Sequence, residues 1–377
     1  MRAFVLVTLL AAPLIPLIPL NPARAQTGKP VPEREYITAR LGELQKVRTP
    51  EGVESLEQVE LGGVKQWISI RGQNRKNPVL LFIHGGPGVP EMPNRWFFQR
   101  PWEDFFTVVQ WDQRGVGKNA VSHDSATIFP TLSLDRIATD AAELAELLRT
   151  RFGQRKIVVV GHSWGSMVGL TLARRRPELL HAYVGIGQVV ATAAERVIWE
   201  GARERAQKAG NAEALRELDS IAPYPGPDGA FDLGKAMLVR KWGALYNGLW
   251  YGVPTDNLMF EMGDWGPEYT AEDIAASGRN QSWAGGALLT ELKAFDFRTS
   301  IPAIEVPVVV VQGRWDLLTP YAPAVDYVRT LRAPSKKLVT LERSGHMPMF
   351  EEPGRFLMTL VNDVLPLTGP PVSFPRP

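Results

Sequence analysis

The chain contains no cysteine, and this absence excludes several kinds of chemistry. Without cysteine it forms no disulfide bond, no thiolate metal site and no lipid-modified cysteine behind a leader segment. An H-E-x-x-H motif is missing as well, so no zinc site is predicted from the sequence. We therefore expect no metal and no cofactor.

The chain also lacks an excess of charge of either sign. It has 42 Lys and Arg against 40 Asp and Glu, and no basic tract interleaved with aromatic residues, so a nucleic-acid surface is not predicted. The nucleotide-binding patterns G-x-G-x-x-G and G-x-x-x-x-G-K-[ST] are absent too. What remains, 377 residues of which 45% are hydrophobic, is typical of a soluble globular enzyme with one large domain or two.

The N-terminus predicts a secretory signal peptide over residues 1–25. One Arg precedes an apolar stretch that runs to Leu20, and Ala23-Arg24-Ala25 forms a small-x-small cleavage pattern before Gln26. Cleavage after Ala25 would leave a periplasmic or secreted protein. The alternative is an uncleaved membrane anchor, but a spanning helix would be broken by three prolines, Pro13, Pro16 and Pro19.

Short apolar runs then alternate with helical patterns. "PVLLFIHGG" and "FFTVVQWDQRG" are each too short for a helix and are closed by glycine, as buried parallel strands are. A helix is predicted over residues 133–152, with Ser133 as its N-cap and Gly153 at its end. The strand "KIVVV", a helix from Trp164 to near Pro177 and the strand "HAYVGIGQV" follow. This order predicts an α/β fold with a mostly parallel central sheet and helices on both faces.

The alternation lapses between residues 190 and 299, where the sequence is helical, loop-like and rich in Trp and Tyr. It resumes with "VPVVVVQGRWD", "KKLVTLERSGH" and a last helix near Pro353. We therefore predict a core made of residues 26–189 and 300–377, with a helical cap of residues 190–299 inserted between two strands. The polar stretch before the first strand is expected to run over the domain surface.

Loops that leave the carboxyl ends of parallel strands meet in one crevice, so functional side chains are expected there. Directly after "KIVVV" stands a G-x-S-x-G motif, residues 161–165. A Ser on a tight turn between strand and helix projects its hydroxyl, and Gly161 and Gly165 let the two elements approach closely. The sequence predicts Ser163 as a nucleophile, with the Trp164 N–H pointing at a developing oxyanion.

A serine nucleophile needs a base, and the base needs a carboxylate that orients it. Of the five histidines only His346 follows the final strand, and it lies downstream of Asp316, which itself ends a strand. We predict His346 as the base and Asp316 as the acid. The rival carboxylates are less well placed, because Asp296 precedes its strand and Asp326 lies within the following helix.

Two more loops follow strands. "HGGPG", residues 84–88, is either a plain tight turn or the source of the second oxyanion donor, from Gly86 or else from Gly85. In "WDQRGVGKN", residues 111–119, Asp112 and Arg114 are expected to pair with each other and brace the loops around the site.

In this order, "HGGPG", "WDQRGVGKN", "GHSWGS", "GRWD" and "SGH" resemble the proline iminopeptidases, serine exopeptidases of the α/β-hydrolase superfamily. The resemblance covers about residues 55–190 and 300–365. It implies the α/β-hydrolase fold, the triad Ser163, Asp316 and His346, and an oxyanion hole formed by Gly86 and Trp164.

Recognition of the substrate carries over less completely. In that family, acidic residues of the cap hold the free α-amino group of the substrate. The nearest match here, Trp199-Glu200-Gly201, is incomplete, so Glu200 and Glu204 are either amine ligands or solvated helix charges. The signal segment also departs from the typical cytoplasmic member.

The sequence thus predicts an exported serine hydrolase that works through an acyl-enzyme and releases N-terminal proline or small apolar residues. One alternative is a carboxylesterase or amidase that acts on a non-peptide ester or amide. Another is a non-catalytic binding protein on a hydrolase fold. The expected partner is a small peptide, amide or ester, with no nucleic acid and no stable membrane insertion after cleavage, and the oligomeric state is not predicted.

Overall fold

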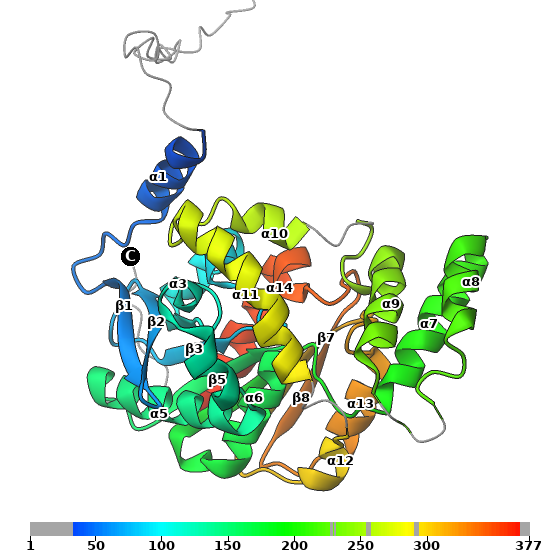
Figure 1. The fold of residues 1–377 in the computed structure, drawn as a ribbon. Coiled ribbons are helices and arrows are strands. Elements are labelled where there is room, and N and C mark those ends of the chain that lie inside the picture. Colours follow the sequence, from blue (N-terminus) through cyan, green and yellow to red (C-terminus); the bar gives the residue numbers. More distant parts are fainter. Residues whose placement is uncertain (1–32, 227–228, 230, 254–257, 290–293, 370–377) are drawn as a thin grey trace, which may run out of the picture.

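In the computed structural model the described part of the chain forms one eight-stranded sheet (Figure 1). The structure describes residues 33–226, 229, 231–253, 258–289 and 294–369, so the predicted signal peptide lies outside the described residues. The strands are β1 (Val53–Leu61), β2 (Val64–Gly72), β3 (Val79–Ile83), β4 (Thr107–Trp111), β5 (Ile157–His162), β6 (Leu180–Ile186), β7 (Val308–Gly313) and β8 (Lys336–Leu341).

Their order in the sheet is β1-β2-β4-β3-β5-β6-β7-β8. The β1–β2 and β2–β4 pairs are antiparallel, and all neighbouring pairs from β4 to β8 are parallel. The predicted mostly parallel sheet is therefore confirmed. Its parallel part brings the carboxyl ends of β3, β5, β7 and β8 to one edge.

Helices cover both faces of the sheet (Figure 1). The α-helices are α1 (Glu33–Gln45), α2 (Arg95–Phe98), α3 (Asn119–Ser122), α4 (Ser125–Ile128), α5 (Leu134–Phe152), α6 (Trp164–Arg175), α7 (Ala194–Lys208), α8 (Ala212–Ser220), α9 (Leu233–Gly243), α10 (Leu258–Gly263), α11 (Ala271–Leu289), α12 (Phe297–Ser300), α13 (Tyr321–Thr330), α14 (Pro348–Glu351) and α15 (Pro353–Thr359). Helices α5, α6 and α13 pack on one face, and α2, α14 and α15 pack on the other.

Two hydrophobic layers hold this arrangement, because side chains alternate along a strand. Leu81 and Val159 lie in the layer beneath α5 and α6, while their neighbours Phe82 and Val160 lie in the opposite layer. All four are fully buried. Burial of such a side chain contributes roughly 1.5–3 kcal/mol, so a shift of register by one residue, which moves apolar groups to the wrong face, is costly.

Helix α5 begins and ends as predicted. The Ser133 hydroxyl accepts a hydrogen bond of 3.0 Å from the Arg136 N–H, and Gly153 ends the helix with φ of 63°. The left-handed conformation at Gly153 carries little cost because glycine has no Cβ.

Helices α7 to α11 lie between β6 and β7 in sequence, within the range predicted for the cap. Helices α7, α8 and α9 gather at one side of the sheet (Figure 1) and share a small core that includes Ile198, Leu218 and Trp242. Helix α11 lies against the "HGGPG" loop, because a Cβ on Gly285 would stand 3.0 Å from the Pro87 carbonyl oxygen. The backbone of α11 therefore comes close to the loop that follows β3.

Residues 33–58 lie at the surface, as expected of a polar stretch, but they form regular structure: helix α1 and most of β1. Helix α1 carries no apolar stripe, and the Arg34 side chain donates to the Tyr269 carbonyl at 2.8 Å. This polar attachment to the cap leaves no hydrophobic periodicity for sequence reasoning to find.

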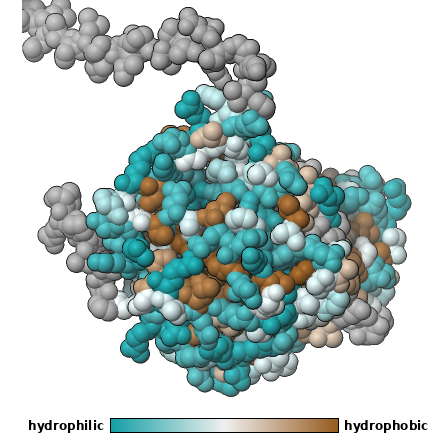
Figure 2. All heavy atoms as spheres, turned by 60° about the vertical axis from the view of Figure 1, so that its left-hand side comes forward, coloured by the Kyte–Doolittle hydropathy of each residue, from teal (hydrophilic) through white to brown (hydrophobic). Residues whose placement is uncertain are grey.

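One face of the molecule is mostly hydrophilic, with hydrophobic residues gathered in a band across its middle (Figure 2). In the described part of the chain, no helix combines the length and the apolar character that crossing a bilayer requires.

Candidate active site

Ser163 occupies a strained turn between β5 and α6. Its φ is 53° and its ψ is −119°, a conformation that non-glycine residues rarely adopt. The Ser163 N–H donates to the Ile186 carbonyl at 2.8 Å, and its carbonyl accepts from the Ser166 N–H at 2.8 Å. These bonds to β6 and α6 hold the turn.

The glycines around Ser163 are required by close packing, as the motif predicted. A Cβ on Gly161 would overlap the Gly165 carbonyl, and a Cβ on Gly165 would overlap the Ile83 carbonyl oxygen at the end of β3. Strand, helix and neighbouring strand therefore meet without side chains between them.

The predicted oxyanion donors stand next to Ser163. Trp164 opens α6, so its N–H lies at the positive end of the helix. Gly86 is exposed, and a Cβ on Gly85 would lie 3.1 Å from the Ser163 Cβ, which places the "HGGPG" loop over the serine. Among the described residues, the N–H groups of Gly86 and Trp164 donate to no other protein group.

Asp316 and His346 are joined as the predicted acid and base would be. His346 Nδ1 lies 2.9 Å from Asp316 Oδ2, and both side chains are buried. The carboxylate also accepts from the N–H groups of Leu318 and Thr319, both at 2.8 Å, from the Thr319 hydroxyl at 2.7 Å and from Gln312 Nε2 at 2.9 Å. These donors fix its orientation toward the imidazole.

The rival carboxylates lie elsewhere. Asp296 caps α12 and pairs with Arg298 at 2.6 Å. Asp326 pairs with Arg329 at 3.2 Å on the exposed side of α13. Neither contacts His346.

The loop that carries His346 is held by α14 and by the cap. The Gly345 N–H donates to Glu351 Oε2 at 2.9 Å, and the Tyr251 N–H donates to the other oxygen of the same carboxylate. Burial raises the pKa of Glu351 to about 7, although both hydrogen bonds lower it. The backbone N–H of His346 donates to the Leu249 carbonyl at 2.9 Å.

Two cavities meet at Ser163, and both are also lined by Gly86. The larger, about 790 Å³ when the space open to solvent is included, reaches beneath the cap and has mostly apolar walls that include Met167, Ile198 and Phe295. The smaller, about 640 Å³, is lined by His346 together with Glu91 and His162. Ser163 and His346 thus share a wall of the smaller cavity, while the larger extends from Ser163 into the cap.

The acidic residues singled out from the sequence do not line either cavity. Glu200 and Glu204 are exposed on α7, where they pair with Arg196 at 3.7 Å and with Lys208 at 2.6 Å. Both are therefore placed as solvated helix charges.

Sequence reasoning missed Glu195, which does line the larger cavity. It is buried with Ile198 and Ala202 on the inner face of α7, at the spacing i, i+3, i+7. Its carboxylate is already engaged: Arg240 donates at 2.5 and 2.9 Å, and the Tyr224 hydroxyl donates at 2.8 Å. Its place in the apolar stripe of α7 was the signal that could have found it.

The loop after β4 braces the site through Gln113. Its side chain donates to the His84 carbonyl at 3.0 Å and accepts from the Trp164 indole N–H at 3.1 Å, so it links the "HGGPG" loop to α6. The Gln113 N–H donates to His84 Nε2 at 3.3 Å. Burial lowers the pKa of His84 to about 4, so this ring is neutral and its Nδ1–H donates to the Gly85 carbonyl.

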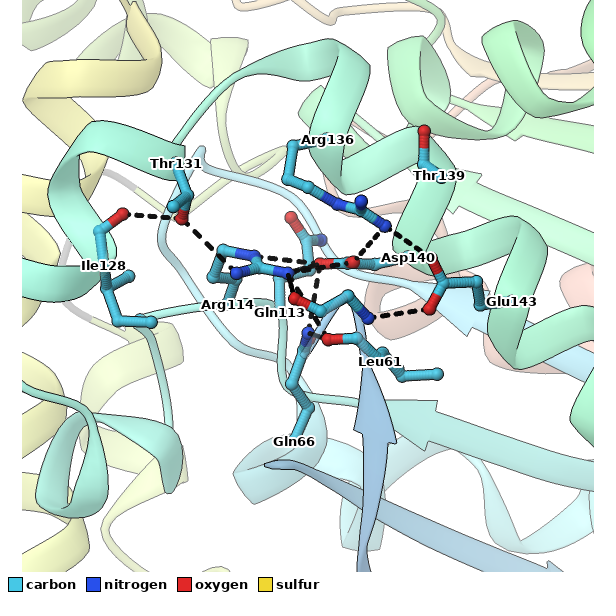
Figure 3. Close-up of polar contacts among 12 residues, drawn as sticks. Leu61, Gln66, Gln113, Arg114, Ile128, Thr131, Arg136, Thr139, Asp140 and Glu143 are labelled. Atoms are coloured by element: carbon cyan, nitrogen blue, oxygen red, sulfur yellow. Dashed lines mark hydrogen bonds and ion pairs between the residues drawn. The ribbon is translucent and has the colours of Figure 1, made fainter. Parts of the chain in front are cut away.

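The predicted pairing of Asp112 with Arg114 is wrong. The Arg114 guanidinium forms two hydrogen bonds of 3.0 Å with Asp140 of α5 (Figure 3). Asp112 instead accepts from the Tyr269 hydroxyl at 2.5 Å and from the Lys118 N–H at 2.7 Å. Arg114 thus ties the loop to α5, while Asp112 ties it to the segment between α10 and α11, and the linear sequence reveals neither contact.

No group of three or more His, Asp or Glu side chains within the described ranges is arranged to hold a metal ion.

A family model described as alpha/beta hydrolase fold matches residues 78–353. The chain belongs to this family. The match spans most of the described sheet and the cap, and it confirms the predicted fold class.

The resemblance to proline iminopeptidases is also confirmed. The chain is 32% identical over 311 residues to the probable aminopeptidase YbaC of Bacillus subtilis, covering 81% of this chain and 94% of the relative. It is 28% identical over 305 residues to the proline iminopeptidase of Neisseria gonorrhoeae, covering 76% and 88%. Among solved structures it is similar to the proline iminopeptidase-related protein TTHA1809 of Thermus thermophilus, with 22% identity, a TM-score of 0.52 and coverage of 84% and 99%.

Proposed function

We propose that the protein is a serine hydrolase that works through an acyl-enzyme. The observation that carries this proposal is the hydrogen bond between His346 and Asp316 at the edge of the sheet where Ser163 stands on its strained turn. Because Nδ1 of His346 is engaged by Asp316, Nε2 is the nitrogen that takes the Ser163 hydroxyl proton. The serine oxygen then attacks the carbonyl carbon of the substrate.

The N–H groups of Gly86 and Trp164 stabilise the oxyanion that forms in this step. His346 gives its proton to the leaving group, so the leaving group lies in the smaller cavity, which His346 lines. The acyl group occupies the larger cavity, whose walls are mostly apolar. Water then attacks the acyl-enzyme with His346 again as the base, and the acid is released.

The first candidate substrate is a peptide with N-terminal proline or another small apolar residue. The names of the relatives in Bacillus subtilis and Neisseria gonorrhoeae support it, and so does the apolar wall of the larger cavity. In this reading Glu195, and not Glu200 or Glu204, is the carboxylate nearest to a bound α-amino group.

The second candidate substrate is an ester or a non-peptide amide, and the state of Glu195 favours it. Both carboxylate oxygens are already bound by Arg240, so the negative charge that would hold an ammonium group is largely neutralised. Within the described part of the larger cavity no other carboxylate is present. A substrate whose acyl group has no free amine does not need a carboxylate in this cavity.

One experiment separates the two candidates. Rates are compared for proline p-nitroanilide, its N-acetylated form and short-chain p-nitrophenyl esters. Preference for the free amine supports the aminopeptidase, whereas turnover of the esters with both anilides inert supports the esterase. A Ser163→Ala variant that keeps full turnover would refute the serine mechanism, and a wild type inert to every substrate would favour a binding protein.

The variants Glu195→Gln and Glu200→Gln refine the result. If Glu195 holds the amine, only Glu195→Gln raises KM for the free anilide. If Glu200 holds it, as the sequence alone allowed, the effect falls on Glu200→Gln.

We also propose that residues 1–25 are removed on export to the periplasm or beyond the cell. The leader composition and the pattern Ala23-Arg24-Ala25 support this. N-terminal sequencing of the native protein should begin at Gln26. A chain that begins at Met1 and sediments with membranes would support the anchor instead.

A further inference from the structure

A second histidine lies directly beside the predicted base. The rings of His162 and His346 have centroids 4.8 Å apart and are tilted by 40°. Both side chains are buried, and both line the smaller cavity together with Ser163. A titratable ring this close to His346 acts on it whether or not it touches a substrate.

The contacts of His162 set its protonation. Its Nδ1 contacts Glu91 Oε1, and its Nε2 lies 2.9 Å from the His346 carbonyl oxygen. Each nitrogen faces an acceptor, but a neutral imidazole has only one N–H. A second proton must therefore lie between His162 and Glu91. Burial lowers the pKa of His162, but Glu91 and the hydrogen bonds outweigh it and the pKa is raised, so the ring carries that proton.

Glu91 has no other partner to balance its charge. The side chain is buried at the start of the short helical turn 92–94, and among the described residues its Oε2 forms no hydrogen bond. The pair is thus a buried carboxylate and imidazolium, each stabilised by the other. The remaining titratable groups that act on His162 or lie beside it are His84, which is neutral, Asp316, which binds His346, and His346 itself.

His162 also completes the attachment of His346. The His346 N–H is bound to the Leu249 carbonyl, and its own carbonyl accepts from His162. The peptide groups on both sides of the His346 Cα are therefore fixed, while Asp316 fixes the ring.

We propose that Glu91 and His162 are positioning residues for His346. His162 donates a hydrogen bond to the His346 carbonyl, and Glu91 keeps a positive charge on His162 beside the His346 ring. This inference rests on the proposed function, in which His346 is the base. A neighbouring cation disfavours protonation of a base. Removing this charge is therefore expected to move the acid limb of the rate profile to higher pH. Glu91 contacts the His162 nitrogen that faces away from the His346 carbonyl, so the positive charge on His162 lies nearer to His346 than the negative charge on Glu91 does.

The test uses a fluorophosphonate, because it reports on Ser163 and His346 without requiring the natural substrate. The Ser163 oxygen forms a bond to phosphorus, the phosphorus–fluorine bond breaks, fluoride leaves and the hydroxyl proton goes to His346. The second-order labelling rate is measured from about pH 5 to about pH 9 for the wild type, Glu91→Gln and His162→Gln. Glu178→Gln, an exposed carboxyl paired with Arg176, is the matched control.

Each variant removes one of the two charged groups and keeps a polar group in its place, and the buried partner left alone is expected to become neutral. In Glu91→Gln burial makes His162 neutral, and in His162→Gln the amide still donates to the His346 carbonyl. We expect the acid limb of the rate profile to move to higher pH by about half a unit or more. At neutral pH the rate of Glu91→Gln should fall about tenfold, with a smaller loss in His162→Gln.

An acid limb that stays in place in folded variants overturns the proposal, and so does a rate loss of the same factor at every pH. Labelling of Ser163→Ala would instead refute the proposed function. If neither variant folds, nitrogen NMR of the wild type decides. Of the five histidines, one should keep both ring N–H groups to a higher pH than an ordinary imidazole, and five rings that all lose the second proton at or below the ordinary pH would overturn the inference.

Discussion

Replacing Asp112 with asparagine should change how the stability of the protein depends on pH. Asp112 is buried after β4, where it accepts from Tyr269 of the cap at 2.5 Å and from the Lys118 N–H at 2.7 Å. Burial raises its pKa from the ordinary 3.8 to about 7, although these hydrogen bonds lower it. The carboxyl group that ties the core to the cap is therefore protonated in mildly acidic solution.

The sign and size of the effect follow from proton linkage. In the unfolded chain Asp112 ionises near pH 3.8, whereas in the folded protein it keeps its proton up to about pH 7. Between these values the folded state binds one more proton, so its stability falls as the pH rises. A pKa difference of this size corresponds to about 4 kcal/mol, and the full loss is present above the folded pKa.

Asparagine does not ionise, so the stability of Asp112→Asn should not fall in this way as the pH rises. Its amide oxygen still accepts from Tyr269 and Lys118, so at about pH 5 the variant should be little changed or slightly less stable. Between about pH 5 and about pH 8 the difference in unfolding free energy should move in favour of the variant by about 3 kcal/mol, which is the part of the loss that falls between pH 5 and the folded pKa. Urea unfolding followed by tryptophan fluorescence measures this difference.

Asp104→Asn is the control, because that carboxylate is exposed and pairs with Arg100 at 2.8 Å. Its difference from the wild type should stay nearly constant over the same pH range. If Asp112→Asn also runs parallel to the wild type, burial does not hold a proton on Asp112 and the reasoning fails.

Three further predictions concern the site. Thr319→Val should lower kcat about tenfold or more with little change in KM, because the Asp316 carboxylate loses a hydroxyl donor worth about 1.5–3 kcal/mol; Thr319→Ser should recover most of the rate, and equal rates in both variants would contradict this. Gly165→Ala should lower the melting temperature by several degrees, since its Cβ overlaps the Ile83 carbonyl oxygen; calorimetry showing an unchanged transition would rule out the close packing. Glu195→Ala should destabilise the cap by about 2 kcal/mol, as urea unfolding would show, because the partly buried Arg240 loses the carboxylate that both its terminal nitrogens bind; a neutral result would mean that other groups replace that carboxylate.

The sequence predicts those parts of the site whose geometry depends on residues close together in the chain or on the order of the strands. Gly161 and Gly165 are fixed by contacts within a few residues of Ser163 and at the end of one neighbouring strand, so a local motif is enough to predict the turn. Asp316 and His346 follow neighbouring parallel strands, so the order of strands alone brings them to one edge. The fold class follows from the same alternation of strand and helix.

Partners that depend on how separate helices pack are not predictable in this way. Arg114 binds Asp140 and not Asp112, because α5 lies against the loop. Glu91 and His162 meet across 71 residues of sequence, without a motif that links them. Such pairs require the tertiary structure.

The cap shows a different limit. Glu200 was singled out by its likeness to a family motif, yet it lies on the exposed face of α7. Glu195 stands in line with Ile198 and Ala202, so the apolar stripe of the helix predicts its burial better than the motif does. Helix α1 has no such stripe, and neither periodicity nor motif reveals it.

The most direct test of the central claim is the burst of p-nitrophenol released when a large amount of enzyme meets a p-nitrophenyl ester. A burst of about one equivalent per chain is expected, followed by slower turnover, together with a matching acyl mass on the peptide that contains Ser163. Ser163→Ala should show neither. A burst that survives in Ser163→Ala, or an acyl group found on another residue, would contradict the assignment of Ser163 as the nucleophile.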